Sequence, residues 1–220
     1  MSQSCALVTV TSGVLYNRFA RDLFFSARQH FRPTESVTFV QLNGREGWPA
    51  ATMYRPHAAH ANLPKTDFVY LIDADMRFEA TVGPEILPEH GGITATLHPG
   101  FVGKPGHELP FERNPESACY VRDGTTYFCG GFYGGSRKAM RRHLYEMILC
   151  IDVDRERGYT PVWHDESAHN RVLHCDPPEV MLDPSYCHPD SSEWYRSWWP
   201  HQYERKLVAL DKTTAERGER

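Results

Sequence analysis

Phe68-Val-Tyr-Leu-Ile-Asp73-Ala-Asp75 decides the fold of this chain, because an apolar run leads directly into two acidic residues. Such a run predicts a buried strand over residues 68–72. Side chains alternate along a strand, so Asp73 and Asp75 project to the same side with Ala74 turned away. Their carboxylates are hard oxygen ligands that can share one Mn²⁺ or Mg²⁺, and such an ion keeps open positions for water and phosphate oxygens. The sequence therefore predicts a metal site at a strand end, with two solvated loop aspartates as the alternative.

On either side of this strand the chain alternates between strand-like and helix-like segments. Apolar residues recur every four positions from Phe19 to Phe31, which is typical of an amphipathic helix over residues 16–31. Ser136 can cap a second long helix. Further strands are expected at residues 6–10, 37–42, 93–97 and 127–133. This alternation favours an α/β fold in which a mainly parallel, twisted sheet is flanked by helices on both faces.

Length and charge limit the classes of protein that this chain can represent. Its 220 residues, 40% of them hydrophobic, are enough for a single domain over 1–220, and the polar tail from about 205 to 220 is expected to be mobile. The net charge of −4 offers no bulk attraction to nucleic acid or to an anionic membrane. Neither a signal peptide nor a membrane anchor is visible before the first strand, so we expect a cytoplasmic location. No pattern in the sequence defines an oligomeric state.

Six segments that follow the acidic pair carry a resemblance to a known family. They are Leu97-His-Pro-Gly-Phe101, Phe111-Glu-Arg113, Glu116-Ser117, Tyr127-Phe-Cys-Gly-Gly-Phe-Tyr-Gly-Gly-Ser136, Trp163-His-Asp-Glu-Ser167 and Pro184-Ser-Tyr186. In order and spacing they resemble the catalytic domain of glycosyltransferase family six, the family of the histo-blood-group A and B transferases. The resemblance implies the nucleotide-sugar fold called GT-A. It also implies retaining, α-1,3-type transfer of GalNAc or galactose from a UDP-sugar donor to a galactose-containing oligosaccharide acceptor.

The same resemblance assigns residues to the nucleotide and the metal. Asp75 is implied as the firmer ligand of Mn²⁺, or of Mg²⁺, while Asp73 also lies near the ribose. A divalent ion between these carboxylates and the diphosphate neutralises the charge of the leaving group. Tyr16 matches a tyrosine near the uracil or ribose, with an ordinary tyrosine at a helix start as the alternative. Lys212 and Arg217 match basic residues of a C-terminal tail that covers the diphosphate.

Glu166 stands where the family carries its essential glutamate, which is implied to contact donor and acceptor. A carboxylate beneath the anomeric carbon can form a glycosyl-enzyme or stabilise an oxocarbenium-like transition state, and the sequence leaves both routes open. The preceding Asp165 is assigned to the donor. Trp163 offers a flat face to an acceptor sugar, and His98 can donate to an acceptor hydroxyl. A core aromatic residue and a buried histidine are the structural alternatives for these two.

Small residues are expected to select the donor sugar. In the blood-group enzymes, glycines at the positions of Gly100 and Gly131 accompany GalNAc transfer, because the acetamido group needs the volume that a methyl group would occupy. Cys129 replaces a Leu or Met of those enzymes and widens the pocket. Gly130, assigned to the donor, and Gly131 can instead be structural glycines of a tight strand pair. The sequence therefore favours UDP-GalNAc, with UDP-galactose as the alternative donor.

Departures from the family pattern concern two stretches of the chain. Between Met53 and Phe68 the chain lacks most of a helix that in the animal enzymes contributes an arginine near the donor sugar. Arg55 is the only local arginine that can replace it. The acceptor-binding aspartate expected after Pro184-Ser-Tyr186 falls on Pro189, so Asp190 is the candidate if the alignment slips by one residue.

Two other classes of protein remain open at this stage. A lectin-like module can use the same aromatic residues and a metal to bind carbohydrate without transferring it. A metal-dependent phosphohydrolase can use the first aspartate of a D-x-D pair as its nucleophile. UDP released from UDP-GalNAc speaks against the lectin, and phosphate released from a phosphate ester without sugar transfer supports the hydrolase.

Overall fold

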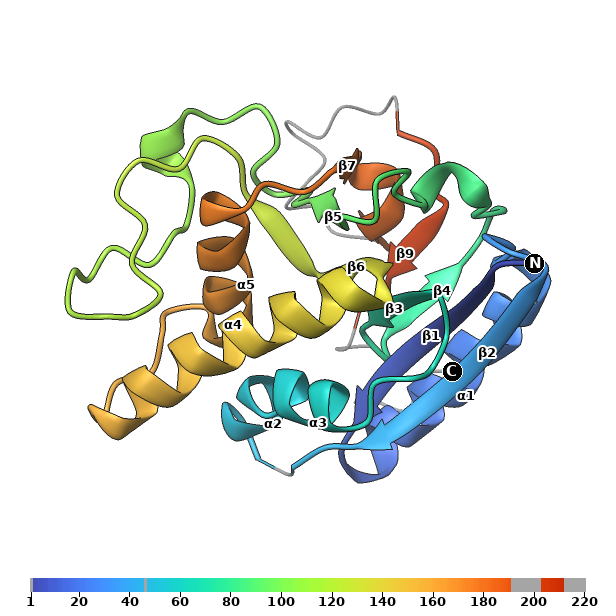
Figure 1. Ribbon diagram of the computed structural model, residues 1–220, viewed down its shortest axis with the longest axis horizontal. Coiled ribbons are helices and arrows are strands. Elements are labelled where there is room, and N and C mark those ends of the chain that lie inside the picture. The colour runs from blue at the N-terminus through green and yellow to red at the C-terminus, as the bar shows by residue number, and fades with distance from the viewer. Residues whose placement is uncertain (1, 46, 191–202, 212–220) are drawn as a thin grey trace.

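The structure is a computed structural model that describes residues 2–45, 47–190 and 203–211 (Figure 1). Its helices are α1 (Gly13–His30), α2 (Ala50–Met53), α3 (Arg55–Ala61), α4 (Arg137–Glu156) and α5 (His164–Cys175). The larger sheet contains β1 (Ser4–Thr11), β2 (Ser36–Asn43), β3 (Phe68–Ile72), β5 (Ile93–Leu97), β6 (Phe128–Ser136) and β7 (Val180–Leu182). The smaller sheet contains β4 (Met76–Phe78), β8 (His188–Pro189) and β9 (Leu207–Ala209). No helix in these residues has the length and apolar character needed to cross a lipid bilayer.

The larger sheet has the strand order β2-β1-β3-β6-β5-β7. β1 runs parallel to β2 and β3, and β5 runs parallel to β7. β6 is antiparallel to both of its neighbours, β3 and β5. The α/β fold expected from the sequence is confirmed, and the sheet is a mixed one. The direction of β6 is not encoded in its side-chain periodicity, because a strand alternates its side chains in the same way whichever way it runs.

This topology collects polar chain ends at one edge of the larger sheet. The parallel strands β1, β2 and β3 all end there, followed by Ser12, Gly44 and Asp73. Because β6 is antiparallel, it begins at the same edge, and the Asp73 N–H donates to the Gly131 carbonyl at 2.9 Å. The carboxyl edge of a parallel sheet is the usual place for a ligand in α/β proteins.

Alternating residues of β3 face two different hydrophobic cores. Phe68, Tyr70 and Ile72 pack in a core with residues of α1 and the smaller sheet. Val69 and Leu71 pack in a second core with residues of α3, α4 and α5. Helices therefore cover both faces of the larger sheet, with α4 and α1 on opposite sides of it (Figure 1).

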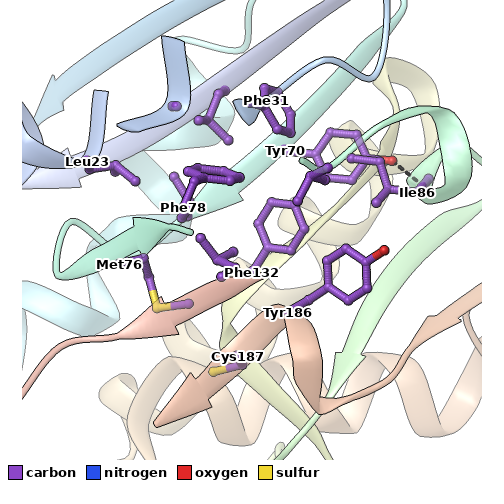
Figure 2. Packing of buried hydrophobic residues seen from close by; sticks show 14 of the residues in the cluster. Leu23, Phe31, Tyr70, Met76, Phe78, Ile86, Phe132, Tyr186 and Cys187 are labelled. Atoms are coloured by element: carbon purple, nitrogen blue, oxygen red, sulfur yellow. Dashed lines mark hydrogen bonds between the residues drawn. The ribbon is translucent and has the colours of Figure 1, made fainter. Parts of the chain in front are cut away.

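A row of aromatic rings ties the chain before β8 to the sheet. Tyr70 stacks on Phe132 with ring centres 5.5 Å apart, and Phe132 stacks on Tyr186 at 6.4 Å (Figure 2). The Tyr70 hydroxyl donates to the Ile86 carbonyl. Cys187 follows Tyr186, and its Sγ lies 3.4 Å from the position that a Cβ atom would take at Gly131. The aromatic row thus brings a segment from the end of the chain against the strand that begins at the polar edge.

The observed elements agree with the predicted ones within a few residues. The strands predicted at 68–72 and 93–97 have those bounds, and the Ser136 hydroxyl caps α4 by accepting from the Ala139 N–H at 3.2 Å. The C-terminal tail, expected to be mobile from about residue 205, contains the strand β9. Leu207 and Val208 are fully buried in β9, because their apolar side chains fill the space between β4, β8 and α1. Residues 212–220 lie outside the described part of the chain.

Candidate active site

A cavity of about 440 Å³ opens at the carboxyl edge of the larger sheet. Its walls come from the turn between β1 and α1, from Gly44 after β2, from α2 and from the segment 73–75. Tyr16, Asp73 and Asp75, all predicted for the nucleotide or the metal, line this cavity together. Its volume lies in the range of small-molecule sites.

The acidic pair meets the requirements of a hard divalent cation. Asp75 is buried with 7% of its surface exposed, and the side chain of Asp73 is 35% exposed. In the described residues no group of three or more His, Cys, Asp or Glu side chains is arranged to hold a metal. Two carboxylates that leave the other coordination positions to water and phosphate oxygens are typical of Mg²⁺ and Mn²⁺ sites that act with a phosphate substrate. The donor set therefore fits the predicted ion.

Arg55 connects the cavity to the glutamate predicted to be catalytic. Its guanidinium forms an ion pair with Asp73, lies 2.8 Å from Asp165 Oδ2, and donates to the Gly130 carbonyl at 3.0 Å. Burial by itself lowers the pKa of this guanidinium, but the charges of Asp165 and Glu166 raise it above its ordinary value. Arg55 is therefore a fixed positive charge between the carboxylates of the site.

Both carboxylate oxygens of Glu166 accept hydrogen bonds. Oε1 accepts from the Tyr127 hydroxyl at 3.0 Å, and Oε2 accepts from the Gly130 N–H at 2.7 Å. Burial raises the pKa of Glu166 to about 7, although both hydrogen bonds act in the opposite direction. Burial and the charge of Glu166 raise the pKa of Tyr127, so its hydroxyl stays a donor. The result is a partly buried, oriented carboxyl group with a pKa near neutrality.

The start of α5 presents the Trp163-His-Asp-Glu motif. His164 has φ 54°, in the left-handed region that few residues other than glycine adopt. Trp48, from the wall of the cavity, contacts the His164 ring edge-on at 4.6 Å between ring centres. Trp163 is 49% exposed. Asp165 and Glu166 lie in the first turn of α5, where the helix dipole favours negative charge.

His98 is linked to Glu166 through Tyr127. The His98 N–H donates to the Tyr127 carbonyl at 3.0 Å, while the Tyr127 hydroxyl bonds Glu166. His98 Nδ1 accepts from the Gly100 N–H at 3.0 Å. Burial lowers the pKa of His98 to about 4, so at neutral pH the uncharged ring carries its proton on Nε2. Its Nε2–H group is thereby available as a donor.

The glycines of β6 face two sides of the strand. A Cβ atom at Gly130 would lie 3.2 Å from Arg55 and 3.5 Å from Glu166, so this position packs directly against the charged groups. A Cβ atom at Gly131 would lie 3.4 Å from Cys187 Sγ and 3.7 Å from Asp73 Oδ2, which are ordinary contact distances. Cys129 is buried in the same hydrophobic core as Cys187. A methyl group at Gly131 would therefore fit the protein and occupy space beside Asp73.

Of the predicted residues that the structure describes, Asp190 lies apart from this arrangement. Asp190 forms an ion pair with Arg205 at 2.9 Å and lies 3.8 Å from Arg77, so its carboxylate joins β8 to β4 and does not line the cavity described above. Its acceptor role stays a prediction. Lys212 and Arg217 lie outside the described residues.

The structure also brings in two side chains to which the sequence assigned no role, together with Arg55. Tyr127 belongs to a quoted motif, but nothing in that motif shows that its hydroxyl reaches Glu166. Trp48 lies in a segment, Gly47-Trp-Pro49, with no family signal. Arg55 was expected near the donor only because no other arginine lies between Met53 and Phe68 to replace the one that the chain lacks.

Comparison with known proteins decides the family. The sequence model of Glycosyltransferase family 6 matches residues 8–204. The chain belongs to this family. The match confirms the predicted resemblance and includes Arg55, the acidic pair, Tyr127 and Glu166.

Relatives in family 6 whose names state an activity match much of the chain. Alpha-1,3-galactosyltransferase 2 of Homo sapiens is 36% identical over 192 residues, covering 74% of this chain and 56% of that protein. Globoside alpha-1,3-N-acetylgalactosaminyltransferase 1 of Mus musculus is 27% identical over 180 residues, covering 79% of this chain and 51% of that protein. Histo-blood group ABO system transferase 1 of Rattus norvegicus is 36% identical over 124 residues, covering 56% of this chain and 35% of that protein. This family 6 chain spans about half the length of the first two relatives.

Proposed function

We propose that the protein is a retaining glycosyltransferase that moves GalNAc from UDP-GalNAc to a galactose-containing oligosaccharide, with UDP-galactose as the second donor. One observation carries the proposal. Arg55 pairs with Asp73 in the cavity and donates to Gly130, whose N–H donates in turn to Glu166, a partly buried carboxyl group held by two hydrogen bonds. A diphosphate site next to an oriented carboxylate is what sugar transfer from a nucleoside diphosphate requires.

The donor side of the proposal rests on charge. Asp73 and Asp75 would hold Mn²⁺ or Mg²⁺, and the ion, when bound, would neutralise the leaving diphosphate. Arg55 holds Asp73 in place and keeps a positive charge beside Asp165. Tyr16 lines the same cavity and offers its ring to the uracil or ribose.

Glu166 is the proposed catalytic residue. Its ionised carboxylate either attacks the anomeric carbon as UDP leaves, with the acceptor oxygen then displacing it, or stabilises positive charge at that carbon while the acceptor attacks from the leaving-group side. Each route keeps the anomeric configuration, and each requires the charged form. The hydrogen bonds from Tyr127 and Gly130 hold the carboxylate in one orientation for either route.

The acceptor side uses residues around Glu166. Trp163, half exposed at the start of α5, would stack on an acceptor sugar ring. The Nε2–H group of neutral His98 would donate to an acceptor hydroxyl. Trp163 is connected to Glu166 through the backbone at the start of α5. His98 is connected to it through Tyr127.

The choice of GalNAc rests on the space at Gly131. A methyl group there would lie 3.4 Å from Cys187 Sγ and 3.7 Å from Asp73 Oδ2, so any side chain at this position would take up room beside Asp73. An acetamido group beside C2 of the donor sugar requires such space. The buried Cys129, on the same strand, is smaller than the Leu or Met of the blood-group enzymes, which is the second basis for the choice of GalNAc.

The test is a transfer assay with purified protein, Mn²⁺ and a panel of galactose-terminated glycans, each offered UDP-GalNAc and UDP-galactose. We expect UDP release together with a product one GalNAc heavier, and α linkage by NMR. Glu166→Gln is the matched control for background hydrolysis. Glycan binding without UDP release would show a lectin, and phosphate release from a phosphate ester without sugar transfer would show a hydrolase. Either result contradicts the proposal.

A further inference from the structure

A second cavity, of about 320 Å³, lies between the α2–α3 segment and the C-terminal end of α4. It shares no lining residue with the cavity at the sheet edge. The side chains that can recognise a ligand here are Arg45, Tyr54, His57, Arg155 and Tyr159, and the rest of the lining is small or apolar.

One short segment forms a wall of both cavities. Trp48, Ala51 and Thr52 line the cavity at the sheet edge, whereas Pro49 and Ala50 line the second one. The helix α2 contains no buried residue. The second cavity therefore lies directly behind the wall of the proposed donor site.

Positive charge dominates the second cavity. The Arg45 guanidinium lies over the Tyr54 ring, 4.3 Å from its centre, and no carboxylate in the described part of the chain forms an ion pair with it. Asp152 is shared, because it lies 2.9 Å from His57 Nε2 and 3.1 Å from Arg155. Two guanidinium groups thus face one carboxylate, which favours an anionic ligand. The planar fork of an arginine stacked on an aromatic ring is suited to a carboxylate.

The remaining surface is suited to a hydroxylated ring. The Tyr54 ring stacks on the His57 ring with 9° between the planes, and Tyr159 lines the same cavity. His57 Nδ1 is buried and has no hydrogen-bond partner in residues 2–45, 47–190 or 203–211. When Nε2–H donates to Asp152, Nδ1 is an acceptor that a ligand hydroxyl can satisfy. Aromatic side chains in the wall, an unused acceptor and an arginine fork together match a pyranose that carries a carboxylate.

We propose that this second cavity binds a sugar acid, with the carboxylate at Arg45 and a ring hydroxyl at His57. The sugar acid is either a free monosaccharide or a residue of the acceptor glycan. Tyr159 and Thr160 of the cavity wall lie in the same short segment as Trp163, the proposed acceptor platform, so one glycan contacting both is the acceptor version of the proposal. Only this acceptor version rests on the proposed transfer function.

The test measures binding by NMR titration in metal-free buffer, with glucuronate and glucose as probes that differ only at C6. We expect glucuronate to bind at least tenfold more tightly than glucose, because a charge-assisted hydrogen bond replaces a neutral one. Arg45→Gln should weaken glucuronate about tenfold or more. Arg45 is exposed, so this variant is expected to fold. Arg21→Gln, which removes an exposed arginine on α1, is the matched control and should bind as wild type does.

Two further arms locate the site and its ligand. Asp75→Asn should leave glucuronate binding unchanged while it weakens UDP binding, so failure of the donor site does not decide the result. In kinetics, Arg45→Gln should raise the acceptor KM several-fold for a glycan that contains glucuronate if the acceptor is the source. If Arg45→Gln leaves the acceptor KM unchanged but weakens the binding of free glucuronate, the ligand is the free sugar acid. Equal binding of glucuronate and glucose, wild-type affinity in Arg45→Gln, or competition between UDP and glucuronate would overturn the proposal.

Discussion

Replacement of Glu166 by glutamine separates the charge of this side chain from its shape. In the wild type its two oxygens accept from Gly130 N–H and Tyr127 O–H. A glutamine can keep the bond from Gly130, and its amide N–H can donate to the Tyr127 hydroxyl, which is both donor and acceptor. We therefore expect the variant to fold with the same contacts and without the negative charge.

The structure sets the size and the sign of the stability change. Burial raises the pKa of Glu166 from 4.5 to about 7, and each unit is worth about 1.4 kcal/mol, so the ionised form lowers folded-state stability by roughly 3 kcal/mol. Because the folded pKa is the higher one, stability is greatest below about 4.5 and is lost as pH rises through about 7. Glutamine carries no charge at any pH. At a pH about one unit above the folded-state pKa of Glu166, Glu166→Gln should thus be more stable than wild type by roughly 3 kcal/mol. Near the unfolded-state pKa the two proteins should differ little in stability.

Activity should change in the opposite direction. Loss of the carboxylate should lower kcat on the order of 10²-fold or more, with UDP binding nearly intact. Urea unfolding of both proteins at acidic and at mildly alkaline pH measures the first effect, and single-donor kinetics with a UDP titration measure the second. A variant that is less stable than wild type at alkaline pH, or that keeps activity within a few-fold, would refute the assignment of Glu166 as a buried catalytic carboxylate.

Three other predictions test neighbouring groups. EDTA should abolish transfer and Mn²⁺ should restore it, while Asp75→Asn should weaken donor binding and turnover together; full activity in EDTA would exclude the metal role. Gly131→Ala should lower kcat/KM more for UDP-GalNAc than for UDP-galactose on the same acceptor, by a difference worth about 1–3 kcal/mol in transition-state free energy. An equal loss for both donors would contradict the role of Gly131 in donor selection. Arg55→Ala should reduce the unfolding free energy by about 3–5 kcal/mol, because Asp165 is left buried without its partner, whereas Arg21→Ala should not; similar urea midpoints for both variants would disprove the role of Arg55.

The sequence alone was sufficient for five strands of the larger sheet, for the two long helices and for several chemical groups. The apolar run before Asp73 predicted β3, and four-residue spacing predicted α1, because periodicity reports which face of a local segment is buried. The position of Asp73 and Asp75 directly after this run placed both carboxylates at the end of a strand. The Trp163-His-Asp-Glu166 motif identified the glutamate through resemblance, and the family match confirms that resemblance.

Only the tertiary structure decided how these groups meet. Arg55 reaches Gly130 across 75 positions of the chain, and Tyr127 reaches Glu166 across 39. No local pattern encodes such a contact, because it depends on the direction of β6 and on the packing of α3 and α5 against the sheet. The raised pKa of Glu166 has the same origin, since a carboxyl group is desolvated only by neighbours that folding brings together. The second cavity arises in this way too, where α2 and the end of α4 leave a space between them.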